Sequence, residues 1–314
     1  MSRLSIIIPV YYNHDNLRPL YADLQEKVLP SLEDYEIVMV DDGSKDDSWS
    51  VMQEIAGMDS HVVLLRLSRN FGSHAAILAG LDACTGDCAV IKAADLQEPS
   101  ELLLEMHEKW REGNKVVLAV RADREDSWMQ KAFANAYYRM VQKYALSNMP
   151  DHGFDIYLID RQVIELLKLL DEKNSALTLQ ILWTGFKSAQ VSYVRRTREI
   201  GTSKWTLSKK IKLVIDSMVS FSFAPIRLVS YVGIIAFIVS IIWAIVVIVS
   251  RLHGSIPVPG YTTLAILILF SSGCIMLTLG IIGEYLWRAV DNSRNRPVYI
   301  VEEKKSSEKQ QDDR

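Results

Sequence analysis

The sequence contains few cysteines and histidines, and they lack the spacings of a disulfide framework or a zinc site. Only three Cys and six His occur among the 314 residues. Cys84 and Cys88 are separated as C-x-x-x-C, and no H-E-x-x-H pair is present. We therefore expect small buried thiols in a reducing compartment and no zinc site built by the protein.

Two nucleotide-binding signatures are also absent. No G-x-G-x-x-G follows the first apolar run, and no G-x-x-x-x-G-K-[ST] occurs anywhere in the chain. Their absence disfavours a dinucleotide-binding domain and a P-loop. Residues 1–4 lead directly into a strand pattern, so we expect no cleavable signal peptide.

Charge is missing from two long stretches in the last third of the chain. Residues 228–250 and 254–283 contain no charged side chain. Each stretch is long enough to cross the roughly 30 Å hydrocarbon layer of a bilayer. We therefore expect two transmembrane helices within 225–290, at about 228–250 and 262–286.

Basic residues gather ahead of these stretches. Residues 195–212 contain seven basic side chains and one acidic side chain, Glu199. The basic residues are Arg195, Arg196, Arg198, Lys204, Lys209, Lys210 and Lys212. Positive charge favours the cytoplasmic side, so we expect a protein integral to the cytoplasmic membrane with both termini in the cytoplasm. The helical spacing of apolar residues in 206–224 predicts an interfacial amphipathic helix, with a packed core helix as the alternative. Residues 291–314 are expected to form a cytoplasmic tail, disordered over the charged residues 304–314.

The first 205 residues alternate between strand and helix patterns. Strands are predicted at 4–10, 36–40, 62–67, 88–93 and 116–120, separated by helical patterns at 15–29, 48–55, 73–81 and 101–110. Parallel neighbours need a crossover element, so this alternation predicts an α/β domain with a doubly wound, mostly parallel sheet.

Polar residues follow these predicted strands. They are Pro9, Tyr11 and Asn13 after the first, Asp41 and Asp42 after the second, Arg69 after the third, Asp95 and Gln97 after the fourth, and Arg121 and Arg124 after the fifth. Each loop alone is ordinary turn chemistry. The carboxyl ends of parallel strands share one edge of the sheet, where such folds bind ligands. Together the loops predict one crevice, with an Asp that can accept hydrogen bonds from a nucleoside and hard oxygens for a divalent cation shared with a diphosphate.

Six segments in order resemble the GT-A glycosyltransferases of family 2. More narrowly, they resemble the polyprenyl-phosphate branch that includes dolichol-phosphate mannose synthases and carries two C-terminal transmembrane helices. The segments are residues 5–13 (SIIIPVYYN), 40–44 (VDDGS), 67–72 (LSRNFG), 94–99 (ADLQEP), 201–205 (GTSKW) and 280–285 (GIIGEY). The resemblance implies a GT-A catalytic domain over residues 1–205.

The resemblance also implies roles for individual residues. It assigns Pro9, Tyr11 and Asp42, with Asn13, Asp41 and Arg69 beside them, to the donor nucleotide. It assigns Asp95 and Gln97 to Mg²⁺ or Mn²⁺ and the donor diphosphate, Arg121 and Arg124 to phosphates, and Arg198, Ser203 and Lys204 to the lipid phosphate. Asp155 is the candidate for orienting the acceptor or closing the metal site. The chain departs from the family pattern at Ala93, where D-x-D has its first Asp, and at Tyr157, where many relatives have Arg.

The resemblance implies inverting transfer of a hexose from a nucleotide diphosphate-sugar to a polyprenyl phosphate, undecaprenyl phosphate, at the cytoplasmic membrane face. UDP is the favoured nucleotide. The partners expected are the nucleotide sugar, the lipid and the bilayer, without nucleic acid; homo-oligomerisation stays open. One alternative is a catalytically inactive scaffold that binds nucleotide sugar, because Ala93 removes a carboxylate. Another is a processive polysaccharide synthase, which the absence of Q-x-x-R-W and the small number of spans disfavour.

Overall fold

Strand β1 (Arg3–Val10) lies in the interior of the sheet, and its sequence explains this position. Ile6, Ile7 and Ile8 are consecutive and each is fully buried. Because successive side chains of a strand point to opposite faces, three buried neighbours require both faces of the strand to be covered.

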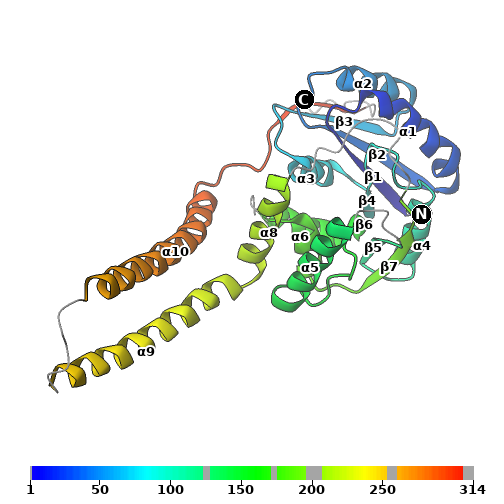
Figure 1. Cartoon of the computed structure of the whole chain (residues 1–314). Coiled ribbons are helices and arrows are strands. Elements are labelled where there is room, and N and C mark those ends of the chain that lie inside the picture. The colour runs from blue at the N-terminus through cyan, green and yellow to red at the C-terminus, as the bar shows by residue number, and fades with distance from the viewer. Residues whose placement is uncertain (1, 123–127, 171–174, 196–206, 253–259, 307–314) are drawn as a thin grey trace. The chain divides into compact units, whose positions relative to one another are not determined.

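The computed structural model describes residues 2–122, 128–170, 175–195, 207–252 and 260–306 (Figure 1). The other strands are β2 (Asp34–Asp41), β3 (Val62–Leu67), β4 (Cys88–Ile91), β5 (Val116–Arg121), β6 (Phe154–Asp160), β7 (Ser188–Tyr193) and β8 (Val301–Ser306). The helices are α1 (His14–Lys27), α2 (Ser48–Met58), α3 (Ser73–Ala83), α4 (Leu102–Arg111), α5 (Trp128–Tyr144), α6 (Arg161–Leu169), α7 (Leu177–Trp183), α8 (Leu207–Phe221), α9 (Ala224–Leu252) and α10 (Tyr261–Ser293), with a short 3-10 turn at Leu29–Ser31.

The strands form one mixed sheet in the order β7-β5-β6-β4-β1-β2-β3-β8. Neighbours β1/β2, β1/β4, β2/β3 and β5/β7 are parallel, whereas β6 is antiparallel to β4 and β5, and β8 is antiparallel to β3. The predicted mostly parallel α/β sheet is therefore confirmed. The carboxyl ends of six strands, together with the start of β6, lie at one edge.

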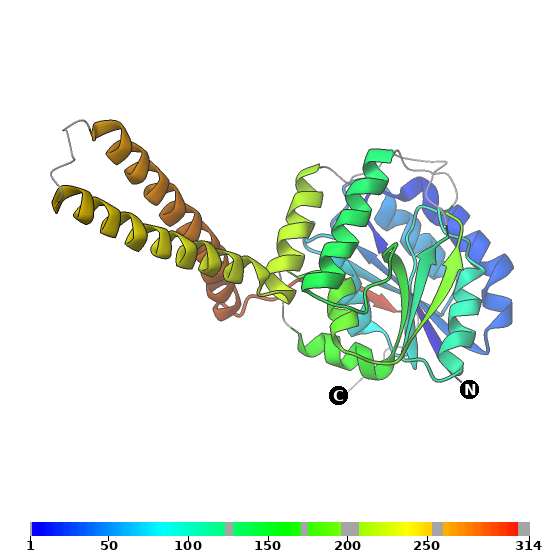
Figure 2. The ribbon, with the colours of Figure 1, turned by 60° about the horizontal axis from the view of Figure 1, so that its bottom comes forward.

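Helices cover both faces of the sheet, as Figure 2 shows. Leu4, Ile6 and Ile8 of β1 belong to the core cluster that includes residues of α1, α2 and α4. Ile7 faces α3 on the other side, where a Cβ on Gly80 would lie 2.4 Å from its Cγ2. Only glycine allows α3 to approach the sheet this closely.

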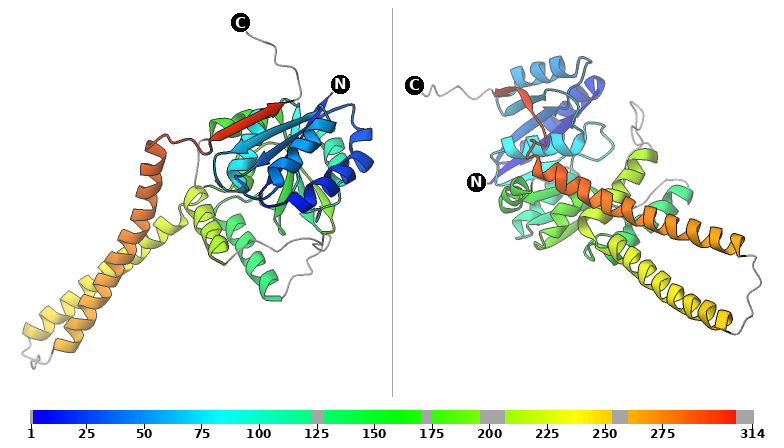
Figure 3. Two further views of the ribbon diagram at one scale, coloured as in Figure 1. Left: turned by 90° about the horizontal axis from the view of Figure 1, so that it is seen from above. Right: turned by 90° about the vertical axis from the view of Figure 1, so that its left-hand side faces the viewer.

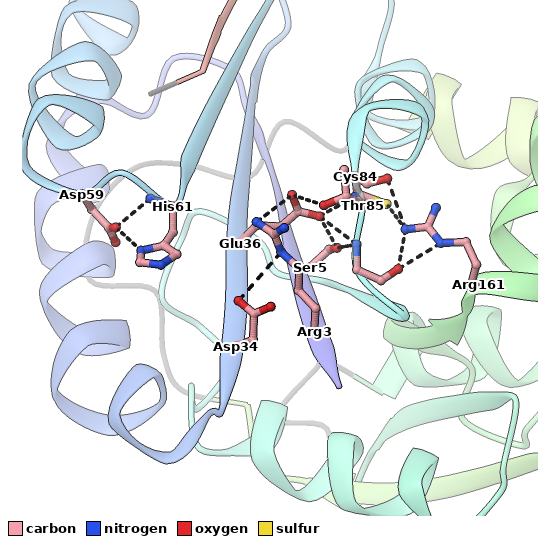
Figure 4. Close-up of polar contacts among 10 residues, drawn as sticks. Arg3, Ser5, Asp34, Glu36, Asp59, His61, Cys84, Thr85 and Arg161 are labelled. Atoms are coloured by element: carbon pink, nitrogen blue, oxygen red, sulfur yellow. Dashed lines mark hydrogen bonds and ion pairs between the residues drawn. The ribbon is translucent and has the colours of Figure 1, made fainter. Parts of the chain in front are cut away.

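A buried carboxylate ties the opposite, amino edge of the sheet together (Figure 4). Glu36 is 2% exposed and accepts hydrogen bonds from Ser5 Oγ at 2.5 Å and from the backbone N of Gly86 at 3.0 Å. Arg161 Nε donates to the Gly86 carbonyl at 2.9 Å. These bonds fix the turn before β4. Cys84 and Cys88 are buried here, as the sequence predicts, and burial raises the pKa of both thiols.

The chain divides into two compact units, Met1–Val214 with Pro297–Arg314, and Ile215–Arg296. In the second unit, charged and polar side chains join α8 to α10. Arg288 Nη2 lies 2.6 Å from Asp216 Oδ1 and 3.0 Å from Glu284 Oε1. Tyr285 donates its hydroxyl to the Ser222 carbonyl at 3.3 Å. The segment 280–285 therefore supplies Tyr285, which contacts the residue after α8, and Glu284, which pairs with Arg288 within α10.

Among the described residues, one helix is long and apolar enough to cross a membrane, the 24-residue segment Phe270–Ser293 of α10. A second candidate exists only if Leu213–Phe221 and Ala224–Ile235, bent by 78° at their break, count as one span. The expected first span at 228–250 lies within α9 and stays a prediction, as does the placement of α8 on a bilayer surface.

The expectation of a disordered tail from residue 304 onward is wrong for residues 304–306, because residues 301–306 are ordered as a strand. This segment forms β8 and pairs with β3 along its length, from Leu67↔Val301 to Val63↔Ser306. The segment (VEEKKS) is charged and mostly exposed. An edge strand gains its order from backbone hydrogen bonds, so its polar composition does not exclude pairing.

Candidate active site

Two loops on one side of the carboxyl edge are bonded to each other. The backbone N of Asp42 donates to the Val10 carbonyl at 2.9 Å, and the backbone N of Tyr12 donates to Ser44 Oγ at 3.0 Å. Asn13 N donates to Ser48 Oγ at 3.1 Å. The loops after β1 and β2, with Tyr11 and Asn13 on the first and Pro9 near the end of β1, therefore form one surface.

Asp42 binds the loop that follows β3. Its side chain is 3% exposed; Oδ1 accepts from Phe71 N at 2.7 Å and Oδ2 from Gly72 N at 2.9 Å. Gly43, at φ +69°, allows this approach, because a Cβ there would lie 2.5 Å from the carbonyl carbon of Arg69. The loops after β1, β2 and β3 are hereafter called the donor side.

Asp41 is fully buried beside them. Its Oδ1 accepts from Ser44 N at 3.0 Å, and Arg66 Nε lies 3.6 Å from Oδ2. Within the described part of the chain, Oδ2 has no hydrogen-bond partner. Burial raises the pKa of both Asp41 and Asp42. Asp41 is therefore a desolvated carboxylate with Arg66 beside it, and its Oδ2 is closed to solvent.

Asp95 and Gln97 lie on a tight turn after β4. The backbone of Leu96 has φ +56°, and Gln97 N donates to Asp95 Oδ1 at 3.3 Å. Both side chains are partly exposed. The turn therefore presents a carboxylate and an amide oxygen at the carboxyl edge, as predicted.

A buried ion pair supports this turn from beneath. Lys92 and Glu98 are 0% and 3% exposed, and Lys92 Nζ lies 2.6 Å from the Glu98 carbonyl and 3.6 Å from Glu98 Oε2. Burial lowers the pKa of Lys92 and raises that of Glu98. The contact from Nζ to the Glu98 carbonyl closes the turn that carries Asp95.

Two arginines reach the same edge from β5 and from the end of β7. Arg121 forms an ion pair with Asp155, which is possible because the antiparallel β6 begins where β5 ends. Arg195 donates to Gln97 Oε1. These loops, from β4, β5, β6 and β7, are hereafter called the metal side.

An open hollow of about 680 Å³ adjoins Arg121 on the metal side. It is lined mostly by polar groups from the turn at residues 147–152 and from β7, including Gln190 and Ser192. Tyr157 does not line this hollow, and its side chain is 2% exposed within β6.

The oxygens of Asp95 and Gln97 fit a hard divalent cation that takes its remaining ligands from a diphosphate. Among the described residues, no group of three or more His, Cys, Asp or Glu could hold a metal ion alone. The absence of a carboxylate at Ala93 is consistent with this finding. A bound metal would therefore depend on the nucleotide for part of its shell.

The structure brings together ten of the predicted site residues at the carboxyl edge: Pro9, Tyr11, Asn13, Asp41, Asp42, Arg69, Asp95, Gln97, Arg121 and Asp155. Arg124, Arg198, Ser203 and Lys204 lie outside the described residues. Their roles stay predictions.

Sequence reasoning missed three groups near the site. The sequence did not show that Lys92 and Glu98, six positions apart, form a buried ion pair. The one available sign of a buried lysine was that Lys92 directly follows an apolar strand. His74, in the first turn of α3, has a pKa lowered to about 4 by burial, so its imidazole is neutral at pH 7. No spacing pattern in the sequence distinguishes this histidine from a surface one.

Comparison with known proteins identifies the family. The model for glycosyl transferase family 2 matches residues 5–167. An uncharacterized glycosyltransferase of Bacillus subtilis, YkcC, is 38% identical over 95% of this chain and 93% of its own length. A bactoprenol glucosyl transferase of Shigella phage SfV is 33% identical over 96% of this chain and 99% of its own length.

A solved structure shares the fold. The glucosyl-3-phosphoglycerate synthase of Mycobacterium tuberculosis, in complex with Mn²⁺, UDP and glucosyl-3-phosphoglycerate, superimposes with a TM-score of 0.50 at 15% identity, covering 70% of this chain and 79% of that one. The chain belongs to glycosyl transferase family 2 and is a glycosyltransferase.

Proposed function

We propose that the protein transfers a hexose from a UDP-sugar to a polyprenyl phosphate, undecaprenyl phosphate, at the cytoplasmic face of the membrane. The observation that carries the proposal is full-length similarity to a bactoprenol glucosyl transferase, combined with the polar loops gathered at one sheet edge. The product would be a polyprenyl-phosphate sugar used in modifying cell-envelope glycans. A chain with apolar helices after its catalytic domain suits an acceptor that stays in the bilayer.

The donor side would bind the nucleoside. Asp41 and Asp42 are held rigidly by backbone and arginine contacts, so the loop that carries them is fixed before the donor binds. Tyr11 lies next to them on the loop after β1, where its ring can contact a base. A prearranged loop of this kind binds without a large cost of ordering.

The metal side would bind the diphosphate. Asp95 and Gln97 would hold Mg²⁺ or Mn²⁺, which neutralises the charge that develops on the departing diphosphate. Arg121 and Arg195 bring positive charge to the same edge, and each can exchange its present partner for a phosphate oxygen. Asp155 would keep Arg121 in place until the donor arrives.

The acceptor would need no strong general base. The second pKa of a phosphate monoester is about 6, so the acceptor phosphate is largely dianionic at neutral pH. One of its oxygens attacks the anomeric carbon as the bond from that carbon to the UDP oxygen breaks, which inverts the configuration. Catalysis then depends on positioning and on stabilising the leaving group.

Radiolabelled UDP-sugars incubated with membranes containing the protein and with undecaprenyl phosphate test the proposal. We expect label in the organic phase after solvent extraction, from one donor of a panel. A water-soluble or insoluble polymer would favour a processive synthase instead. Binding of UDP without any labelled product from the panel would favour an inactive scaffold.

A further inference from the structure

The strand that follows the last helix joins the catalytic sheet next to the donor side. β8 pairs with β3, and the chain reaches it only after α10, through residues 294–300. Figure 3 shows β8, in red, alongside the strands that are coloured blue. The chain thus returns from its apolar helices to the edge of the sheet from which the donor-side loop at residues 68–72 emerges.

Contacts at the start of β8 reach this loop directly. The Ile300 carbonyl accepts a hydrogen bond from the backbone N of Ser68 at 3.0 Å. Tyr299 donates its hydroxyl to Asp82 Oδ2 on α3. Residues on both sides of the loop, Ser68 before it and the helix α3 after it, therefore contact the segment that leads into β8.

β8 also helps to enclose the base of the donor side. Trp49 of α2 has Arg66 Cζ at 5.6 Å and Lys305 Nζ at 5.9 Å from its ring centroid. Arg66 is the residue whose Nε lies 3.6 Å from Asp41. The side chain of Lys305 in β8 thereby packs on the same ring as the arginine that neighbours the buried carboxylate.

The loop at 68–72 is held at two points, and Ile300, directly before β8, supplies one of them. At its far end, Phe71 and Gly72 donate to Asp42, and at its near end, Ser68 donates to Ile300. β8 itself is mostly exposed and buries little apolar surface. Its pairing therefore contributes more to the position of this loop than to the hydrophobic core.

We propose that β8 is a positioning element for donor binding. By fixing Ser68, it holds the 68–72 loop in the conformation in which Arg69 and Asp42 face the nucleotide. This inference rests on the proposed function for the identity of the donor. Residues 294–300 connect α10 directly to β8, so one continuous segment links this helix to the strand that positions the 68–72 loop.

The register of the strands provides a matched pair of proline variants. Just before β3, the His61 carbonyl accepts a hydrogen bond from Ile37 of β2, and just after β3, the Ser68 N–H donates to Ile300, next to β8. The backbone groups of successive residues in a strand point to alternating sides, so the odd-numbered residues of β3 bond to β2 and the even-numbered ones to β8. Arg66 therefore faces β8, and its partner Glu303 faces β3. Glu303→Pro should break the ladder, whereas Lys304→Pro, one residue further along, places the proline on the open edge.

Binding of UDP in the presence of Mn²⁺ should separate these variants. We expect the dissociation constant to rise roughly tenfold in Glu303→Pro, as loss of about one net hydrogen bond can produce, and to stay unchanged in Lys304→Pro. In turnover assays, the KM for the UDP-sugar should rise while the KM for undecaprenyl phosphate stays the same. Equal binding by both variants would overturn the proposal.

Hydrogen exchange tests the same inference without a ligand. The amides of Phe71 and Gly72 should lose protection in Glu303→Pro and retain it in Lys304→Pro. If Glu303→Pro does not fold, Tyr299→Phe serves as a milder variant, in which we expect a smaller loss of protection at these amides. Failure of the wild-type protein to bind UDP would contradict the proposed function, whereas unchanged protection in both Glu303→Pro and Tyr299→Phe would contradict the role of β8.

Discussion

On the donor side the loops after β2 and β3 are joined by backbone N–H groups bound to a buried carboxylate, whereas on the metal side the loops are joined by contacts between side chains. Arg66 also lies 3.6 Å from Asp41, and Asp95 accepts the N–H of Gln97. Asp42 accepts from Phe71 N and Gly72 N, and Asp41 accepts from Ser44 N. On the metal side, Asp155 pairs with Arg121. The loops of the donor side are thus joined by short contacts with the main chain, and those of the metal side by contacts between side chains of different loops.

This difference suits the two parts of a nucleotide sugar. A nucleoside is uncharged and is recognised by hydrogen bonds in fixed positions, which a rigid main-chain frame provides. A diphosphate with its cation brings charges of both signs, and paired side chains can exchange partners when it binds. Substitutions on the two sides should therefore affect donor recognition and turnover differently.

The largest effect is expected from Asp95→Asn on the metal side. Loss of the carboxylate should reduce kcat roughly a hundredfold or more, because it removes a ligand of the cation that stabilises the leaving group. A Mn²⁺ titration in the presence of UDP should show weaker metal binding, measured by electron paramagnetic resonance. Glu108→Gln, at an exposed position on α4, serves as the control. Wild-type turnover and metal affinity in Asp95→Asn would remove Asp95 from the site.

The second-largest effect on activity is expected from Arg121→Ala. Removing the guanidinium should lower kcat/KM for the donor about 10- to 100-fold, since a charge-assisted contact to phosphate is lost. Stability should change little, because the Asp155 side chain is 55% exposed and surface pairs contribute little. Arg121→Lys should recover only part of the activity, since lysine cannot make the bidentate contact. An unchanged kcat/KM in Arg121→Ala would show that the ion pair is only structural.

The sequence was sufficient to place both sides at one edge. Apolar runs such as residues 4–10 identify buried parallel strands, and the polar residues that follow them must then share an edge. This reasoning gave the positions of Asp42, Asp95 and Arg121 correctly, because each lies within a few residues of a strand end.

Contacts between distant segments could not be predicted in this way. Arg195 and Gln97 are far apart in the chain, and nothing local in either segment specifies their contact. β8 lacks the alternating apolar pattern of a half-buried strand, because an edge strand is ordered by its backbone. The burial of Lys92 and Glu98 could not be predicted either. Charged residues are seldom fully buried, so a segment that contains them is normally interpreted as a solvated loop.

On the donor side, Gly43→Ala should have an intermediate effect. At φ +69°, a Cβ would lie 2.5 Å from the carbonyl carbon of Arg69, so the 68–72 loop must move away. We expect a loss of about 1 to 3 kcal/mol in the free energy of unfolding, with a raised KM for the donor. Gly185→Ala is a matched control, because Gly185 has φ +70° and a Cβ added there would have no heavy atom within 4 Å. Both variants carry the backbone strain, and only Gly43→Ala should change the KM. Equal KM values would show that the close approach of the two loops does not matter for the donor.

The smallest effect is expected from Arg69→Ala, also on the donor side. Arg69 is exposed, and its guanidinium lies 4.0 Å from the ring centroid of Phe71. An exposed contact between a cation and an aromatic ring contributes about 0.5 to 1 kcal/mol, so the KM for the donor should rise only two- to fivefold, with kcat unchanged. Arg111→Ala, on the exposed surface of α4, serves as the control. A fall in kcat instead of a rise in KM would mean that Arg69 acts on the leaving group, and the assignment of nucleoside and diphosphate to separate sides of the edge would then be wrong.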